Sequence, residues 1–272
     1  MRKSVLLLLA SLLVAPTYSA FADPISDAVA DESRSSDARL RDEYRHPQQT
    51  LRFFDVQPEM TVVEISPGGG WYSNILAPLL EDKGKLVAAH FYLYDGAPGY
   101  YKRLLDAFKT KMTDDGIYSK VELTAFHPTK ALDIAEPSSA DRVLTFRNVH
   151  NWYMGDGDKG VLNAMQAFYK ALKPGGILGV VEHRLPESAT EEQMNAGGAG
   201  YMKQSYVIEM AEKAGFELVA TSEINANPMD TADHPKGVWT LPPSMAMGDE
   251  KRNHYLSIGE SDRMTLKFVK PE

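Results

Sequence analysis

Residues 62–73, VVEISPGGGWYS, join an apolar run to a glycine-rich turn and then to a helix-like segment. The β-branched run TVVEI predicts a strand at residues 61–65, and WYSNILAPLLED predicts the helix that follows. In an open α/β sheet, ligands bind beyond the carboxyl ends of the strands, where the next helix offers free N–H groups. Glycines let the backbone approach such a ligand closely. The stretch therefore predicts a ligand-binding turn, with a tight strand-to-helix turn that binds nothing as the alternative.

The rest of the chain continues this alternation of strands and helices. Apolar or alternating runs predict strands at residues 85–91, 120–126, 141–149, 177–183, 216–224 and 262–270, and helices at 99–112, 160–172 and 204–214. Strands that alternate with helices of this length predict an α/β fold with a mostly parallel sheet and helices on both faces. We expect one domain over residues 37–272. Residues 225–260 interrupt the alternation and are predicted to form an ordered insertion, since they contain Trp239 and Leu241.

The N-terminus has the pattern of an export signal. Arg2 and Lys3 precede an apolar run from Val5 to Ala15, and Ala20-Phe21-Ala22 has the small-x-small form of a cleavage site. We therefore expect residues 1–22 to be a signal peptide of a bacterial protein that is periplasmic or secreted. The alternative is an uncleaved anchor, for which the apolar run is short. The polar, small residues 23–36 are expected to form a flexible leader.

Composition excludes several classes of site and partner. The 272-residue chain has no cysteine, so it can form no disulfide, thiolate metal site or cysteine nucleophile. Its formal net charge of −8 argues against a nucleic-acid partner, because binding to duplex DNA requires a basic surface. Beyond residues 1–22 no apolar run approaches membrane-spanning length, so no stable membrane insertion is expected after cleavage.

Two motifs resemble one known family. Glu64-Ile-Ser-Pro-Gly68-Gly69-Gly70 resembles motif I of the class I S-adenosylmethionine-dependent methyltransferases, whose usual form is acid-x-Gly-x-Gly-x-Gly, and AFYKALKPGGILGVVEH (167–183) resembles their helix and fifth strand. The resemblance covers roughly residues 38–270 and is closest to a signal-peptide-bearing bacterial branch described as predicted methyltransferases. It implies a Rossmann-like, seven-stranded sheet whose last strand runs antiparallel between the fifth and sixth. It also implies S-adenosyl-L-methionine as the cofactor.

The resemblance further implies where the cofactor would bind. Ser66 stands where the family has its first motif glycine, a place that serine can occupy if its backbone angles are ordinary. At the end of the second strand, where the family usually has an acid for the ribose hydroxyls, this chain has His90. After the third strand, Phe126 can stack on a base. The expected cofactor-binding residues are Glu64, Ser66, Gly68, Gly69, Gly70, Tyr72, His90, Phe126 and Asn148.

The loop after the fourth strand and the end of the fifth strand carry the candidate catalytic residues. In TFRNVHNWY (145–153) we expect His150 to act as a general base or to orient the acceptor, because histidine titrates near neutral pH. Glu182 at the end of the fifth strand could pair with a histidine as a catalytic or a purely structural contact. The histidines show no compact ligand spacing, so no metal site is expected. The predicted catalytic residues are His150, Asn148, Tyr153 and His183.

These observations favour an exported methyltransferase that acts on a small molecule. A non-catalytic module that keeps the methyltransferase fold to bind a ligand is the alternative. The enzyme hypothesis predicts an open pocket that joins the glycine turn to His150, whereas the module hypothesis predicts a cleft filled by side chains. Trp239 of the insertion would then be part of a lid over the acceptor pocket or of a rigid cover over the sheet edge.

Overall fold

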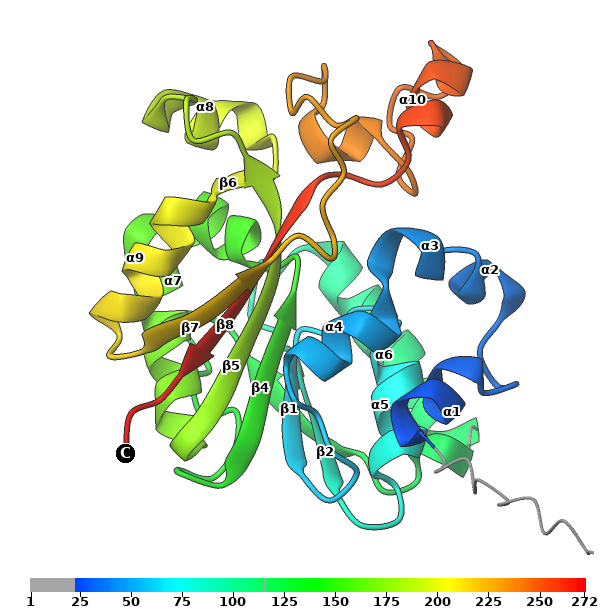
Figure 1. The fold of residues 1–272 in the computed structure, drawn as a ribbon, viewed down its shortest axis with the longest axis vertical. Coiled ribbons are helices and arrows are strands. Elements are labelled where there is room, and N and C mark those ends of the chain that lie inside the picture. Colours follow the sequence, from blue (N-terminus) through cyan, green and yellow to red (C-terminus); the bar gives the residue numbers. More distant parts are fainter. Residues whose placement is uncertain (1–22, 115) are drawn as a thin grey trace, which may run out of the picture.

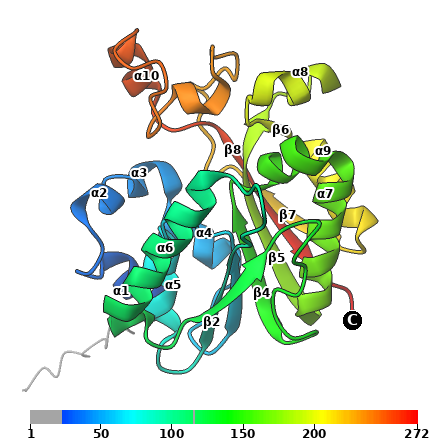
Figure 2. The ribbon, with the colours of Figure 1, turned by 180° about the vertical axis from the view of Figure 1, so that it is seen from behind.

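A computed structural model describes residues 23–114 and 116–272, and the predicted signal peptide at residues 1–22 lies outside them. A twisted sheet forms the middle of the molecule, with helices on both of its faces (Figure 1). The view from behind shows the same three layers (Figure 2). Within the described residues, no helix is both long and apolar enough to cross a membrane.

The strands follow the predicted order. They are β1 (Thr61–Ile65), β2 (Lys85–Phe91), β3 (Glu122–Phe126), β4 (Ala140–Phe146), β5 (Leu172–Leu185), β6 (Met202–Lys203), β7 (Glu217–Ser222) and β8 (Arg263–Val269). The sheet order is β3-β2-β1-β4-β5-β8-β7, and β6 adds a short pairing to β5. Strand β8 runs antiparallel to both β5 and β7, while the first five strands pair in parallel. The Rossmann-like sheet with an inserted antiparallel last strand is therefore confirmed, and β6 is an element that we did not predict.

The helices are α1 (Pro24–Ala30), α2 (Ser36–Arg39), α3 (Asp42–Arg45), α4 (Pro47–Phe53), α5 (Ser73–Leu80), α6 (Gly99–Asp114), α7 (Val149–Ala171), α8 (Glu191–Asn195), α9 (Gln204–Lys213) and α10 (Arg252–Ile258). The predicted helix begins at residue 160, but α7 begins eleven residues earlier, directly after β4. It includes a kink at Gly157, where the backbone angles are not helical. This extension places the first turn of α7 at the carboxyl end of the sheet.

Alternation along the strands produces two cores. Val63, Ile65 and Val87 face helices α7 and α9, in a cluster that includes Phe168 and Met210. On the opposite face, Val62 and Leu86 pack with α4, α5 and α6. Successive side chains of a strand point to opposite faces, so burial on both sides explains why these strands are almost continuously apolar.

The prediction of a flexible leader at residues 23–36 is wrong. Residues Pro24–Ala30 form α1, and its Ile25 and Ala28 are buried against the core below α4 and α5. A proline in the first turn is compatible with a helix start, and two apolar residues three positions apart share one helix face. Farther along, Ser35 caps α2 through its side chain, which accepts from the N–H of Ala38. The segment is therefore part of the folded domain.

The insertion at residues 225–260 is ordered and lies above the carboxyl edge of the sheet together with α8 (Figures 1 and 2). A small apolar cluster of Leu241, Tyr255 and Ile258 holds it together. Asn225 joins it to the domain, because its side-chain N–H group donates to Thr50 and Thr265 at 3.0 and 2.9 Å. The insertion therefore covers the edge at which the predicted site residues meet.

Candidate functional site

A pocket of about 470 Å³ opens beside the glycine turn. Its wall includes the turn from Ser66 to Gly69, Tyr72, Phe91 of β2 and Asn148 after β4. A side chain built on Gly68 or Gly69 would meet no protein atom within 4 Å, so both backbones face open space. Gly68 has a φ of +60°, in the left-handed region that favours glycine. The turn thus presents bare backbone to a volume typical of small-molecule sites, about 300–1,000 Å³.

Ser66 and Gly70 depart from the simple picture of the turn. Ser66 has a φ of +47°, so it adopts the left-handed conformation, and the condition of ordinary backbone angles is not met. Its N–H donates to the carbonyl of Ala89 at 2.8 Å, which ties the turn to β2. At Gly70 (φ +78°) a Cβ would lie 3.1 Å from Tyr118 Oη and 3.2 Å from Phe108. Gly70 therefore allows close packing behind the turn and does not line the pocket.

Tyr72 and Asn148 lie where a ligand would contact them. The Tyr72 ring stacks on Phe146 at 3.6 Å, and its hydroxyl donates to the carbonyl of Arg45 at 3.2 Å. The Asn148 amide donates to the carbonyl of Ile65 at 2.9 Å, which links the ends of β4 and β1. Both residues are on the pocket wall.

Glu64 lines the same pocket from the carboxyl end of β1. It is buried, and the hydroxyl of Ser73 donates to it at 2.6 Å. Burial raises its pKa to about 7, although the Ser73 hydrogen bond and nearby Arg147 oppose the shift. Glu64 therefore changes its protonation state near neutral pH, inside the pocket.

The raised pKa of Glu64 makes a prediction for stability. The folded-state pKa of about 7 exceeds the usual glutamate pKa of 4.5, so between these values the folded state keeps a proton that the unfolded state has lost. Stability must therefore fall as the pH rises through this window. We expect Glu64→Gln to reduce the loss of unfolding free energy between pH 5 and pH 8 by up to about 3 kcal/mol. Denaturant unfolding at both pH values measures this, with exposed Glu122→Gln as the control; equal losses in wild type and Glu64→Gln would contradict it.

The roles predicted for His90 and Phe126 are corrected. The Phe91 N–H donates to His90 Nδ1 at 2.8 Å, so the hydrogen lies on Nε2, which donates to the Gly68 carbonyl at 3.0 Å. Burial lowers the pKa of His90 to about 4, so the ring is neutral. Both nitrogens engage backbone, and His90 holds the turn in place; neither nitrogen remains for a ribose. Phe126 is buried against Trp152 and Phe168 in the core of the sheet, away from the pocket wall.

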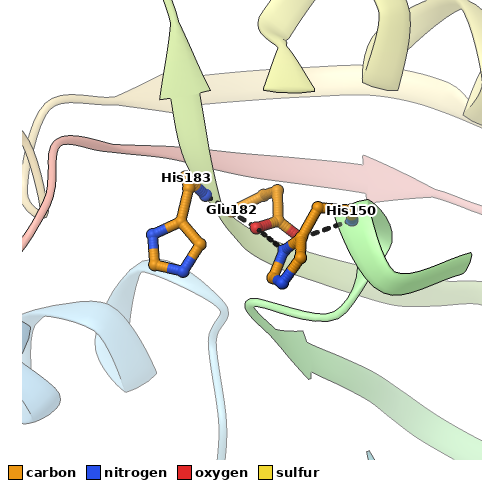
Figure 3. A group of neighbouring side chains, drawn as sticks. All are labelled: His150, Glu182 and His183. Carbon is orange, nitrogen blue, oxygen red and sulfur yellow. Dashed lines mark hydrogen bonds and ion pairs between the residues drawn. The ribbon is translucent and has the colours of Figure 1, made fainter. Parts of the chain in front are cut away.

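His150, Glu182 and His183 meet at the ends of β4 and β5 (Figure 3). Glu182 is fully buried and accepts the Nδ1 hydrogen of His150 at 2.8 Å. The backbone N–H groups of Val149, His150 and His183 also donate to it, at 2.6, 3.3 and 2.8 Å. The sequence predicted an acid–histidine contact at this place, and the structure supplies it through Glu182 and the first turn of α7.

The trio also has the composition of a metal site, since its possible ligand atoms lie within 4.8 Å of one another. However, each Glu182 oxygen already accepts two hydrogen bonds, which uses the acceptor capacity of a carboxylate. The Nδ1 of His183 is engaged by the Ser261 hydroxyl at 2.5 Å. A bound ion would have to displace these donors, so we assign the trio to a hydrogen-bonded network.

The four predicted catalytic residues do not share one cavity. His183 lines a second pocket of about 240 Å³, together with Trp239 of the insertion. His150 is 5% exposed and lies behind it, with its ring centre 5.2 Å from that of His183 and 5.9 Å from that of Trp239. Tyr153 lines a different depression, next to Tyr206. The predicted open passage from the glycine turn to His150 is therefore wrong, because the pocket wall at that end is made of Arg147 and Asn148.

An arginine cluster, which we did not predict, separates the two pockets. Arg41, Arg45 and Arg147 line both of them. Arg147 directly follows β4, and the other two are four residues apart on the segment from α2 to α3, which packs beside the turn. In the sequence, a charged residue immediately after the apolar run VLTF was the available sign of Arg147. Arg41 and Arg45 gave no such sign, because they lie in a short segment far from the motifs.

A single carboxylate, that of Glu260, forms ion pairs with two arginines of this cluster and with Arg263. Glu260 forms ion pairs with Arg41 at 2.5 Å, with Arg45 at 3.2 Å and with Arg263. Burial alone would raise the pKa of Glu260, but the three guanidinium groups hold it well below the usual range. Burial, His150 and the same arginines lower the pKa of His183 well below its usual value, so its ring is neutral.

Comparison with known proteins shows which solved structures share this fold. No protein-family model matches the chain, and no curated protein matches its sequence. An S-adenosylmethionine-dependent methyltransferase from Aquifex aeolicus matches with a TM-score of 0.52 at 18% identity, over 75% of this chain and 94% of that chain. Phosphoethanolamine N-methyltransferase 2 of Haemonchus contortus, solved with S-adenosyl-L-methionine, matches with a TM-score of 0.54 at 13% identity, over 93% and 61%. The 4+2 cyclase SpnF matches with a TM-score of 0.55 at 16% identity, over 91% and 92%.

At these identities the similarity establishes the fold alone. A cyclase stands among the matches, so the fold by itself does not fix the reaction. The sheet order, with an antiparallel β8 between β5 and β7, nevertheless extends over nearly the whole described chain. This protein has the fold of the class I S-adenosylmethionine-dependent methyltransferases.

Proposed function

We propose that this protein is an S-adenosylmethionine-dependent methyltransferase that acts on a small molecule. One observation carries the proposal: the motif I turn bounds an open pocket of about 470 Å³, and the backbones of Gly68 and Gly69 face it without obstruction. The pocket lies at the carboxyl ends of β1 and β4, where ligands bind in open α/β sheets. Its similarity in fold to methyltransferases solved with S-adenosylmethionine supports the same ligand.

The residues around this pocket fit the cofactor. The bare turn at Gly68–Gly69 permits close approach, the Phe91 ring offers a flat apolar surface, and the shared arginines can pair with an amino-acid carboxylate. Glu64 is an acid on the pocket wall. Its deprotonated, negatively charged form would attract the positively charged sulfonium of the cofactor. When bound, the cofactor supplies an electrophilic methyl group that a nucleophilic atom can attack directly.

His183 and His150 are the residues that we assign to the methyl acceptor. We assign His183 to the acceptor side because it lines the second pocket, and its neutral ring can accept a hydrogen bond. His150 is a positioning residue in this proposal, since Glu182 fixes its ring and its own exposure is small. Alignment and exclusion of water would be the main contributions of the protein.

The proposal includes export, because residues 1–22 have the pattern of a cleavable signal peptide. A periplasmic or secreted enzyme would then begin at Asp23. Amino-terminal sequencing of the protein recovered from its bacterial host tests this. A sequence starting at Asp23 supports export, and a retained Met1 in all of the protein argues against it.

A non-catalytic ligand-binding module remains the second candidate. It is favoured by the absence of an acid at the end of β2 and by the burial of His150 outside both pockets. Isothermal titration of the purified protein with S-adenosylmethionine and S-adenosylhomocysteine tests the cofactor site. Dissociation constants in the micromolar range support the methyltransferase proposal. No binding at millimolar ligand would overturn it and leave the pocket to a different ligand.

A further inference from the structure

The second pocket has an excess of positive charge. Arg41, Arg45, Arg147 and Arg263 all line it, and among the described residues Glu260 is the only acid on its wall. Even if a carboxylate of the cofactor joined Glu260, the guanidinium groups would outnumber the carboxylates. The cofactor also carries a sulfonium, so it brings positive charge of its own. Buried charges are normally paired, and this arrangement has fewer carboxylates than guanidinium groups, since Glu260 alone pairs with Arg41, Arg45 and Arg263.

The same shortage of negative partners is visible at the N–H donors of single arginines in the cluster. Among the residues that the structure describes, Arg147 forms no side-chain hydrogen bond or ion pair, although it borders both pockets. Arg45 is 4% exposed, and its Nη1 has no hydrogen-bond partner. Its Nε meets Glu260, and its guanidinium lies over the Trp71 ring at 4.6 Å, so the side chain is held in place with a donor unused. Burial and the neighbouring Arg263 lower the pKa of Arg147 to about 10, which agrees with uncompensated charge.

The lining of this pocket also has an apolar part. Trp239, Pro242 and Pro243 of the insertion belong to it, together with the neutral ring of His183. The volume of about 240 Å³ is below the range of about 300–1,000 Å³ that is usual for drug-sized ligands. A molecule that fits has a small, flat or apolar body on one side and an anionic group on the other.

We propose that this second pocket binds a small organic acid, whose carboxylate or phosphate pairs with Arg147 and Arg45 while its apolar part lies against Trp239. Guanidinium groups bind both kinds of oxyanion through paired N–H donors, so the shared chemistry is a planar or tetrahedral oxyanion. The assignment of this acid as the methyl acceptor rests on the proposed function. The anion site itself rests only on this pocket and its arginines.

Three probes that share a phenyl ring test the site: benzoate, phenyl phosphate and the neutral benzamide, which matches benzoate in shape. Each is titrated calorimetrically into the purified protein, in a buffer free of phosphate and sulfate. We expect at least one anion to bind and benzamide to bind at least tenfold more weakly, because charge-assisted hydrogen bonds are the stronger ones. The stronger of the two anions identifies the preferred group. Equal binding of benzamide, or no binding of either anion at millimolar concentration, would overturn the inference.

Variants then assign the site to its arginines. Arg147→Gln should weaken the bound anion about tenfold or more, and Arg147→Lys should weaken it less. Arg147 has no ion pair to lose, and circular dichroism confirms that each variant is folded. Arg103→Gln, at an exposed position of α6, is the matched control. An equal loss in Arg103→Gln, or no loss in Arg147→Gln, would contradict the assignment.

Titration of S-adenosylmethionine into the same samples separates the two proposals. Anion binding without cofactor binding would support the anion site and overturn the methyltransferase proposal. Cofactor binding without anion binding would overturn the anion site and support the methyltransferase proposal.

Discussion

Replacing Gly68 with valine is expected to lower the affinity for S-adenosylmethionine at least a hundredfold. Gly68 has a φ of +60° and its missing side chain leaves open space on the pocket wall. A β-branched residue is a genuine outlier in this conformation, so valine would either distort the turn or push its methyl groups into the volume that the ligand needs. Isothermal titration of wild type and variant measures the change.

The control for this substitution is Gly96→Val. Gly96 has a φ of +84° and is also surrounded by open space, but it lies in the exposed loop after β2 and is not on the pocket wall. The two variants carry a similar backbone strain, on the order of 1–2 kcal/mol. If Gly96→Val lost as much affinity as Gly68→Val, the effect would be one of general destabilisation and the cofactor site would have to lie elsewhere.

Replacing Glu182 with glutamine is expected to lower the free energy of unfolding by about 3–5 kcal/mol. The buried carboxylate accepts the N–H groups of Val149, His150 and His183 as well as the His150 ring hydrogen. An amide keeps one acceptor oxygen and turns two hydrogens toward groups that are themselves donors. Each buried donor that loses its partner costs roughly 1–3 kcal/mol. Denaturant unfolding measures the loss.

Glu209→Gln is the matched control for Glu182. Glu209 pairs with Lys213 on the exposed side of α9, where an ion pair contributes at most about 1 kcal/mol. A loss in Glu182→Gln no larger than that of Glu209→Gln would mean that the network around His150 is held by other contacts. The substitution would also free the His150 ring, so its proton resonances should shift in the folded variant.

The strands were predictable because their sequence is locally unambiguous. Thr61–Ile65 and Lys85–Phe91 are short β-branched or apolar runs between turns, and both match the structure residue for residue. Helix α1 was missed because its apolar face consists only of Ile25 and Ala28, which become informative once α4 and α5 provide a surface. The two-residue strand β6 depends on pairing with β5, which no local pattern encodes.

The candidate site was predictable only where it follows the chain. The glycine turn, Tyr72 and Asn148 lie next to strand ends, and the sheet order brings them to one pocket. His90 and Phe126 are also near strand ends, but their environment decided their roles: one binds the backbone of the turn and the other lies in the core. The arginine cluster gathers residues as far apart as Arg41 and Arg147, so no spacing in the sequence could reveal it.

The shared arginine wall makes the two pockets thermodynamically dependent on each other. Arg41, Arg45 and Arg147 border both, so a negative group in one pocket changes the electrostatic free energy of a ligand in the other. Linkage requires that this coupling be reciprocal: if an acid tightens cofactor binding by some factor, the cofactor tightens binding of the acid by the same factor. A neutral product in the second pocket would forfeit that coupling, so the affinity for the cofactor would change when the charged occupant is replaced.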